Sequence, residues 1–190
     1  MSRRGQVILA STSPRRAELL RAAGYSFTVI PSAVPEVPHP RETAARFAER
    51  AASEKARDVA LRLNQGLVLG ADTVVVTGGA ILGKPRDARD ARRMLQLLSG
   101  RTHRVVTGVA LWRAGGGPVE SGVSITHVTF RKLSRAEIEW YVDCGEPMDK
   151  AGAYGIQEKA GLFVSAIRGS YSNVVGLPLE LVYGMLGLPA

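Results

Sequence analysis

The sequence contains a single cysteine, Cys144, among 190 residues, so no internal disulfide can form. Phe, Trp and Tyr together make up only 6% of the chain, and they do not alternate with basic residues as in surfaces that stack single-stranded nucleic acid. No apolar run is long enough to cross a membrane, and the residues before the first predicted strand do not resemble a signal peptide. We therefore expect a cytoplasmic globular protein that binds no membrane, and nucleic acid is a disfavoured partner.

Positive charge is what the sequence has in excess. It holds 25 Lys and Arg residues against 17 Asp and Glu residues, a formal net charge of +8. The basic residues are spread along the chain instead of forming one block. Such an excess favours anionic partners such as nucleotides or phosphorylated metabolites. The length is sufficient for one core, or for two small lobes that share a sheet.

The stretch Leu67–Lys84 organises the rest of the chain. Its first part is apolar and rich in β-branched residues, which predicts a strand packed on both faces. Asp72 interrupts this run. An unpaired ionised carboxylate there would cost roughly several kcal/mol, so Asp72 should be neutralised or held by cations or donors. Two interpretations stay open at this point: a structural Asp at a strand end, and a catalytic or metal-binding carboxylate.

An anion-binding segment follows the first predicted strand, Gln6–Ala10. Ser13 is a good helix N-cap, Pro14 a good first helical residue and Gly24 a good terminator. The free N–H groups at a helix N-terminus attract phosphate. Hydroxyls and guanidiniums in the same segment strengthen this interpretation over a capped helix with two surface arginines. The candidate phosphate-binding residues are Ser11, Ser13, Arg15 and Arg16.

Two further charged residues stand out between these segments. Arg41–Leu63 predicts a long amphipathic helix, and Lys55 falls on its apolar stripe. A lysine there must extend to solvent, pair with an acid or reach a site. Glu36 lies in the proline-rich segment Val34–Pro40, which should be irregular.

The remaining chain predicts helices and strands around a mixed sheet. Gly78–Lys84 resembles a P-loop, but Pro85 stands where the magnesium-binding Ser or Thr should be, so we reject a P-loop and keep Lys84 as a candidate phosphate partner. Strands alternate with helices early, and long strands pair late, which favours a mixed α/β sheet with a groove. The other predicted elements are helices at 87–98, from Ser134 to about Val142 and after Pro178, strands at 105–112, 119–130 and 162–167, a long loop at 144–157 and a polar turn at 169–173.

Seven short motifs occur in order over nearly the whole chain: ASTSPRR (10–16), EKA (54–56), GADTVV (70–75), GKP (83–85), SGRTH (99–103), GEPMDKAGAYGIQ (145–157) and GSYSNVVGLP (169–178). Their combination resembles the Maf family of nucleoside triphosphate pyrophosphatases. The resemblance implies a single Maf-like domain over residues 1–190. It also implies an elongated mixed α/β fold related to the inosine-triphosphate pyrophosphatases, with two lobes around a cleft, and commonly a homodimer.

The same resemblance implies roles for individual residues. Asp72 matches the family's proton acceptor, and Glu36 its metal-site glutamate, which would share a Mg²⁺ or Mn²⁺ ion with Asp72. Lys55 and Lys84 match site lysines. The residues that mark the branch acting on dTTP and UTP are Arg15, Thr73 and Gln157.

The resulting hypothesis is metal-assisted hydrolysis between the α- and β-phosphates, which releases pyrophosphate and a nucleoside monophosphate. Ser11, Ser13 and Arg16 would hold the triphosphate, and the two lysines would offset its charge. Two alternatives remain: a hydrolase of other, non-standard nucleotides, and a non-enzymatic regulator of division that binds protein or nucleic acid.

Overall fold

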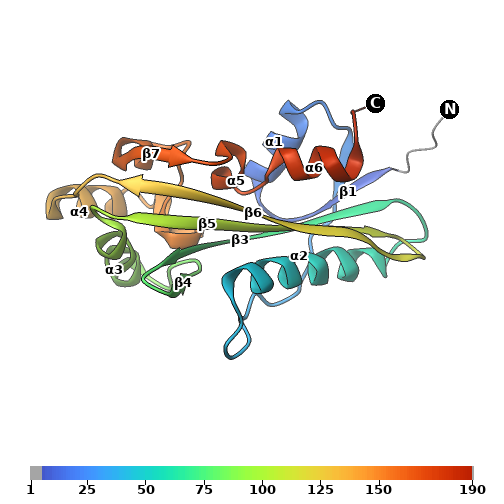
Figure 1. Cartoon of the computed structure of the whole chain (residues 1–190), viewed down its shortest axis with the longest axis horizontal. Coiled ribbons are helices and arrows are strands. Elements are labelled where there is room, and N and C mark those ends of the chain that lie inside the picture. Colours follow the sequence, from blue (N-terminus) through green and yellow to red (C-terminus); the bar gives the residue numbers. More distant parts are fainter. Residues whose placement is uncertain (1–5, 190) are drawn as a thin grey trace. The chain divides into compact units, whose positions relative to one another are not determined.

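The computed structural model describes residues 6–189, and over these residues it contains a seven-stranded sheet flanked by helices (Figure 1). The strands are β1 (Val7–Ala10), β2 (Phe27–Val29), β3 (Leu67–Thr77), β4 (Ala80–Leu82), β5 (Thr102–Arg113), β6 (Gly117–Phe130) and β7 (Val164–Arg168). Their order is β2-β1-β3-β5-β6-β7, and β4 pairs with β3. β1 is parallel to β2 and to β3, whereas β3/β4 and β6/β7 are antiparallel. The predicted mixed α/β sheet is confirmed.

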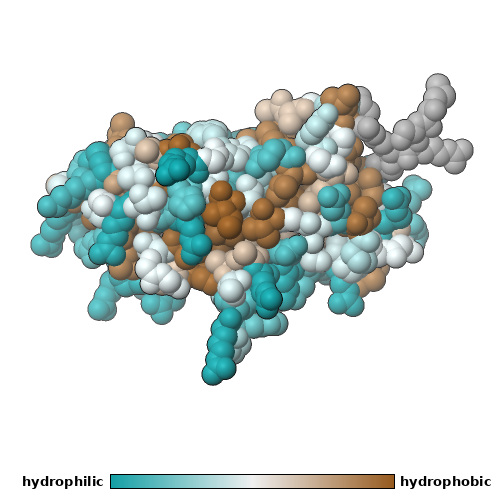
Figure 2. Space-filling view, in the orientation of Figure 1, coloured by the Kyte–Doolittle hydropathy of each residue, from teal (hydrophilic) through white to brown (hydrophobic). Residues whose placement is uncertain are grey.

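The helices are α1 (Pro14–Ala22), α2 (Ala44–Ala60), α3 (Ala88–Leu98), α4 (Arg135–Asp143), α5 (Tyr171–Val175) and α6 (Leu179–Leu186), with 3₁₀ segments η1 (Glu146–Asp149), η2 (Ala151–Ala153) and η3 (Lys159–Phe163). None of the helices in the described part of the chain is long and apolar enough to span a membrane. Apolar residues on the face shown in Figure 2 gather in several small groups separated by polar ones.

The chain divides into two compact units. The first unit holds the residues up to Asp72, Thr107–Ser124 and the residues from Gly176 onward; the second holds Thr73–Val106 and Ile125–Val175. Strands β3, β5 and β6 contribute residues to both units.

In the first unit, helices cover both faces of the sheet: α2 lies on one side, and α1 with α6 on the other (Figure 1). Successive strand residues point to opposite faces. The residues that pack on α2 are Ile8, Ala10 and Val68, and those that pack on α1 and α6 are Leu9, Leu69 and Ala71. Asp72 has the parity of Val68, so the alternation directs its side chain toward α2.

Two glycines let α2 approach the sheet closely. A Cβ atom built on Gly70 of β3 would lie 2.1 Å from the carbonyl oxygen of Ala52. One built on Gly108 of β5 would lie 2.2 Å from the carbonyl oxygen of Ala48. Both obstructing atoms belong to the backbone of α2, so only glycine permits this distance. The close approach brings Lys55, one turn after Ala52, to the level of Asp72.

In the second unit, α3 packs on α4, and Arg92 Nε donates to Glu139 Oε2 between them at 2.5 Å. A cluster of aromatic rings lies beside these helices. It includes Phe130, Tyr141, Tyr154 and Phe163. His103 is fully buried against this cluster, with its Nε2 atom 2.8 Å from the Tyr154 hydroxyl. Burial lowers the pKa of His103 to about 4, so the ring is neutral at pH 7 and packs as part of the core.

The structure corrects several predicted boundaries. The helix expected from Arg41 begins at Ala44, because the Thr43 hydroxyl accepts the Arg46 N–H at 3.3 Å and forms the N-cap. The polar turn expected at 169–173 is wrong, since Tyr171–Val175 forms the short helix α5. The long loop at 144–157 contains the 3₁₀ segments η1 and η2. The helix expected from Ser134 to about Val142 is confirmed as α4, and a capping box of Ser134 with Glu137 starts it.

Candidate active site

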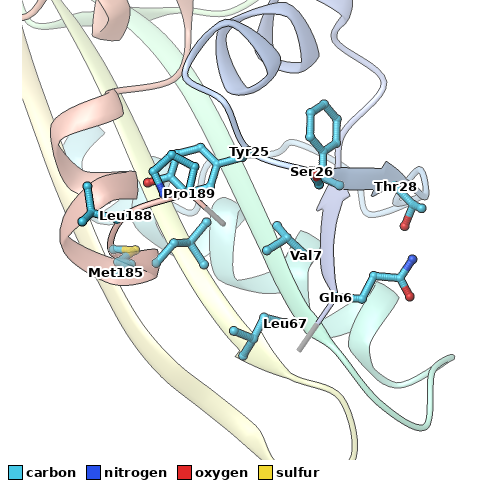
Figure 3. Close-up of a pocket in the computed structure, with 11 residues that line it drawn as sticks. Gln6, Val7, Tyr25, Ser26, Thr28, Leu67, Met185, Leu188 and Pro189 are labelled. Carbon is cyan, nitrogen blue, oxygen red and sulfur yellow. The ribbon is translucent and has the colours of Figure 1, made fainter. Parts of the chain in front are cut away.

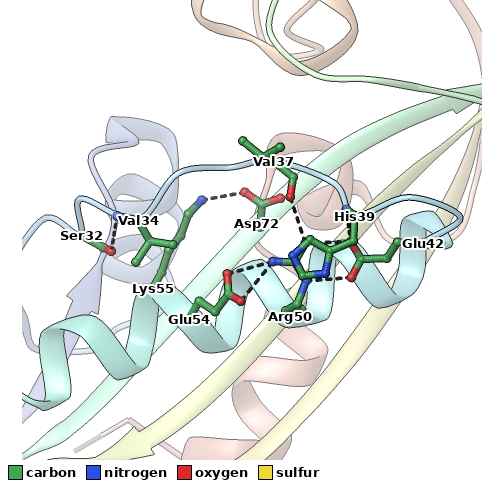
Figure 4. Close-up of polar contacts among 9 residues, drawn as sticks. All are labelled: Ser32, Val34, Val37, His39, Glu42, Arg50, Glu54, Lys55 and Asp72. Atoms are coloured by element: carbon green, nitrogen blue, oxygen red, sulfur yellow. Dashed lines mark hydrogen bonds and ion pairs between the residues drawn. The ribbon is translucent and has the colours of Figure 1, made fainter.

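One buried ammonium group joins two carboxylates at the centre of the first unit. Lys55 Nζ donates to Asp72 Oδ1 at 2.6 Å and to Glu36 Oε1 at 2.5 Å. Figure 4 shows Lys55 extending from α2 toward Asp72 on the neighbouring strand. The side chains of Lys55 and Asp72 are 7% and 4% exposed, whereas that of Glu36 is 42% exposed. The lysine on the apolar stripe of α2 therefore pairs with acids, one of the options that the sequence left open.

Burial dominates the electrostatics of Asp72. It raises the pKa of this carboxyl above the ordinary value, against the opposing positive charges of Lys55 and Arg16, and the negative charge of Glu36 raises the pKa further. A buried carboxyl with a raised pKa beside cations is a typical arrangement for a proton acceptor.

The segment before α1 forms a small polar network. Ser11 Oγ accepts the Ser13 N–H at 3.1 Å and a hydrogen bond from Arg16 Nη1 at 3.2 Å. Arg16 Nε donates to the carbonyl oxygen of Gly176 at 2.8 Å. Ser13 occupies the N-cap position as predicted, but its side chain makes no capping bond, and the Ser11 hydroxyl binds the Ser13 backbone instead. The half-buried Arg15 follows on the first turn.

The Arg16 guanidinium interacts electrostatically with Asp72 and Glu36, the two carboxylates that Lys55 joins. Burial lowers the pKa of its guanidinium, and the carboxylates of Asp72 and Glu36 oppose this shift. Three cations, Arg15, Arg16 and Lys55, thus accompany two carboxylates in the first unit. The excess of positive charge suits a phosphate-bearing ligand.

The other three predicted site residues belong to the second unit. Thr73 directly follows Asp72 in β3 and is partly buried, whereas Lys84 and Gln157 are exposed. The Gly152 N–H donates to the carbonyl oxygen of Gly83 at 3.0 Å. This bond ties the segment that carries Lys84 to the loop that leads to Gln157.

Comparison with known proteins gives the family. A family model described as Maf-like protein matches residues 6–188. The chain belongs to the Maf-like family. Its sequence is 52% identical to a dTTP/UTP pyrophosphatase of Myxococcus xanthus (strain DK1622) over 96% of this chain and 93% of that relative. It is also 52% identical to one of Symbiobacterium thermophilum over 95% and 92% of the two chains.

A third relative of this Maf-like chain, the dTTP/UTP pyrophosphatase of Moorella thermoacetica, is 51% identical over 96% of this chain and 94% of the relative. Among solved structures, a nucleoside-triphosphatase described as a dITP/XTP pyrophosphatase from Mycobacterium abscessus is 21% identical. The match covers 67% of this chain and 75% of that one, with a TM-score of 0.43.

The two carboxylates of this Maf-like chain are the candidate metal ligands. Glu36 and Asp72 direct oxygen atoms at one point, which Lys55 Nζ marks. Within residues 6–189, no three His, Cys, Asp or Glu side chains are grouped to hold a metal ion by themselves. Mg²⁺ often binds one or two carboxylates and takes its other ligands from water and substrate phosphates. A divalent cation that binds together with a nucleotide would need only these two carboxylates, and it would compete for them with the Lys55 ammonium that lies between them.

An apolar cavity of about 380 Å³ also lies in the first unit, among β1, β2 and the end of α6 (Figure 3). Val7, Leu67, Met185 and Leu188 are among its lining residues. None of the predicted site residues lines it, and its polar lining residues, Gln6, Tyr25, Ser26 and Thr28, carry no positive charge that would attract phosphate. The cavity is thus separate from the candidate site.

Sequence reasoning gave no role to Lys150, which the structure places inside the loop that leads to Gln157. The buried Nζ atom donates to the Glu146 carbonyl oxygen at 2.7 Å and to Asp149 Oδ1 at 2.8 Å, and lies 3.1 Å from Glu158 Oε2. The only sequence signal was a lysine in a loop otherwise rich in Gly and Ala. Its Nζ atom contacts both Glu146 and Glu158, which lie 12 positions apart in the sequence, so the loop is folded around one ammonium group.

We expect Lys150→Met to lower the free energy of unfolding by about 2 kcal/mol, because charge-assisted hydrogen bonds to a buried ammonium are lost. For a chain of this length the melting temperature should fall by roughly 4–8 °C in a thermal scan. Lys132→Met, at an exposed lysine, serves as the control and should melt near the wild type. Equal melting of both variants would contradict the structural role of Lys150.

Proposed function

We propose that this chain is a nucleoside triphosphate pyrophosphatase that hydrolyses dTTP and UTP to the monophosphate and pyrophosphate. The observation that carries the proposal is the buried Asp72–Lys55 pair, which the exposed Glu36 carboxylate joins, beside the Ser11–Arg16 segment. The names of relatives about half identical over nearly the full chain support the choice of reaction and substrates.

In the proposed reaction, Asp72 takes the proton of the water that attacks the phosphoanhydride. Its raised pKa and its burial favour proton uptake from a neighbouring water. Lys55 lies within hydrogen-bond distance of Asp72 and holds the orientation of the carboxylate. The protonated base is then neutral, which removes one negative charge next to the departing pyrophosphate.

The triphosphate is bound by the segment before α1. Ser11, Ser13, Arg16 and the N–H groups of the first turn supply donors. Lys84 and Lys55 add positive charge that offsets the charge developing on the phosphates. Glu36 and Asp72 would hold a Mg²⁺ or Mn²⁺ ion, which supplies further positive charge to the phosphates when it is bound.

Base selection belongs to Gln157, Thr73 and Arg15. A glutamine amide offers both a donor and an acceptor, which match the carbonyl–imide edge of thymine and uracil. Gln157 is exposed in the structure without nucleotide, and a bound base that covered it without pairing with its amide would be rejected strongly. The protein is further proposed to act as a cytoplasmic homodimer, in line with its single cysteine and its resemblance to Maf proteins.

The test is a nucleotide panel with identified products. Purified full-length protein is incubated with Mg²⁺ and with dTTP, UTP, purine triphosphates or 5-methyl-UTP, and the phosphorus products are identified by ³¹P NMR. We expect kcat/KM for dTTP and UTP to exceed that for purine triphosphates by at least about 100-fold, with pyrophosphate as the released product. Orthophosphate release would contradict the proposed bond cleavage.

The same panel separates the alternatives. Higher kcat/KM for a modified nucleotide than for dTTP would favour a hydrolase of non-standard nucleotides. Binding of nucleic acid or a protein partner with no hydrolysis of any nucleotide would favour a regulator of division. The buried acid with its lysine supports the enzyme, because a binding module has no need of a carboxylate with a raised pKa.

A further inference from the structure

One arginine fastens the segment that carries Glu36 to helix α2 (Figure 4). Arg50 Nε and Nη2 donate to the two carboxylate oxygens of Glu42 at 2.8 and 2.7 Å, and Nη2 also donates to the carbonyl oxygen of Val37 at 3.0 Å. Nη1 donates to both oxygens of Glu54 at 3.1 and 3.0 Å. Every N–H of the guanidinium thus has an acceptor, a bidentate arrangement that lysine cannot reproduce.

The part of the chain that Arg50 binds to α2 has no regular secondary structure. Residues 33–42, here named the Glu36 segment, contain no helix or strand. The His39 N–H donates to Glu42 Oε2 at 2.9 Å, so the same carboxylate that binds Arg50 also closes the end of the segment. Arg41 has a φ of 63°, a left-handed conformation that an arginine keeps only when its surroundings hold it there.

Glu36 is the residue immediately before the anchored Val37. Its carboxylate reaches Lys55, and its side chain is 42% exposed, so the position of the carboxylate depends on the path of the backbone that carries it. Ordering an irregular backbone costs conformational entropy, and the Arg50 contacts offset that cost at the residue next to Glu36. A displacement of about 1 Å in a catalytic arrangement can reduce turnover about 100-fold.

We propose that Arg50 is a positioning residue, which holds the Glu36 carboxylate at the Lys55–Asp72 pair by clamping the Glu36 segment to α2. This role rests on the proposed pyrophosphatase function. Arg50 acts through Glu36 and itself touches neither the phosphates nor the water. A surface ion pair that only stabilised the helix would leave turnover unchanged.

The chain offers a matched control in Arg62. Its Nη2 atom donates to the carbonyl oxygen of Pro31 at 2.7 Å and to Asp58 Oδ2 at 3.2 Å. Arg62 therefore links a backbone carbonyl to an acid of α2, as Arg50 does, and it contacts neither Val37 nor Glu42. The same Asp58 oxygen accepts the N–H of Ala33 at 3.3 Å, so Arg62 acts at the first residue of the Glu36 segment, away from Val37 and Glu42. We compare Arg50→Met with Arg62→Met in the full chain.

The first measurement is hydrogen–deuterium exchange of the protein without nucleotide. In Arg50→Met, we expect the amides of His39 and Glu42, which are hydrogen-bonded to each other's residue within the segment, to exchange at least about ten-fold faster than in the wild type, because the segment opens locally. In Arg62→Met, these amides should exchange at the wild-type rate. Unchanged exchange in Arg50→Met would overturn the clamp, whatever the activity of the variant.

The second measurement is a double-mutant cycle with Glu36→Gln, followed as pyrophosphate release from dTTP with Mg²⁺. Arg50→Met alone should lower kcat about ten-fold or more with little change in KM, whereas in the Glu36→Gln background it should change kcat less than about two-fold. Arg62→Met should keep the wild-type kcat. If each substitution lowered kcat independently, so that the two reductions multiplied in the double variant, Arg50 would not act through Glu36 and the proposal would be overturned.

The two measurements test the positioning role of Arg50 separately from the proposed pyrophosphatase function. No hydrolysis by the wild type would refute the proposed function and the positioning role with it, and the exchange data would then identify Arg50 as a purely structural anchor. Wild-type hydrolysis together with a normal kcat in Arg50→Met would refute the positioning role alone.

Discussion

Replacing Asp72 with asparagine is expected to lower kcat for dTTP by about 100- to 10,000-fold, the range that a general base contributes. Asparagine has nearly the same shape but cannot accept the proton of the attacking water. It also removes the negative charge that Lys55 Nζ contacts at 2.6 Å. The measurement is the steady-state rate of pyrophosphate release with Mg²⁺.

The same substitution is expected to leave the fold intact. Burial raises the pKa of Asp72, so the folded protein disfavours the charged carboxylate, and a neutral amide relieves that cost. Lys55 retains Glu36 as its partner. The melting temperature of Asp72→Asn should therefore equal or exceed that of the wild type, a trade of stability against activity that is frequent at functional sites.

Asp90→Asn is the matched control for this experiment. The Asp90 side chain is 5% exposed, close to the 4% of Asp72, and it is also bound by arginines. Its pKa is lowered, against the effect of burial, by hydrogen bonds from Arg93 and Arg86, so the ionised form stabilises the fold and the asparagine variant should melt below the wild type. Its kcat should stay normal. Near-normal turnover of Asp72→Asn would remove Asp72 as the base.

Asp72 and Lys55 show how much of the candidate site the sequence alone can predict. An acid within an apolar strand and a lysine on an apolar helix stripe each violate the local pattern, and such violations mark sites. Strand alternation then fixes the face on which Asp72 lies. The sequence could not pair Lys55 with Glu36, because that contact depends on the path of an irregular segment whose anchor, Arg50, is an ordinary helix residue by pattern.

The loop at 144–157 contains secondary structure that the sequence did not predict. Its composition correctly excluded a long regular element, but the 3₁₀ segments η1 and η2 are accompanied by contacts that composition does not reveal, namely the local bonds of Lys150 and the bond from the Gly152 N–H to the Gly83 carbonyl oxygen. The helix α5 was missed for a similar reason: the Ser170 Oγ atom accepts the Asn173 N–H at 3.3 Å, which starts a helical turn in a segment of turn-forming residues.

The position of α2 on the sheet could not be predicted from the sequence either, because a glycine in a strand does not show which helix packs against it. Gly108→Ala is expected to lower the free energy of unfolding by about 3 kcal/mol or more. The added Cβ would lie 2.2, 2.3 and 2.4 Å from Ala48 O, Ala48 C and Glu49 N, which all belong to the α2 backbone. No side-chain rotation relieves such contacts, so the helix must move, and it takes Lys55 away from Asp72.

We therefore expect Gly108→Ala to melt about 6–12 °C below the wild type and to lose kcat even in the fraction that remains folded. Gly184→Ala is the control: no heavy atom lies within 4 Å of its added Cβ, and alanine within α6 should stabilise the helix slightly. Adding Ala48→Gly to Gly108→Ala should not restore stability, because the obstruction is the carbonyl of Ala48 and not its methyl group. Restoration by this second change, or a wild-type melting temperature for Gly108→Ala itself, would show that α2 can shift on the sheet without cost and that its close approach does not hold Lys55 in place.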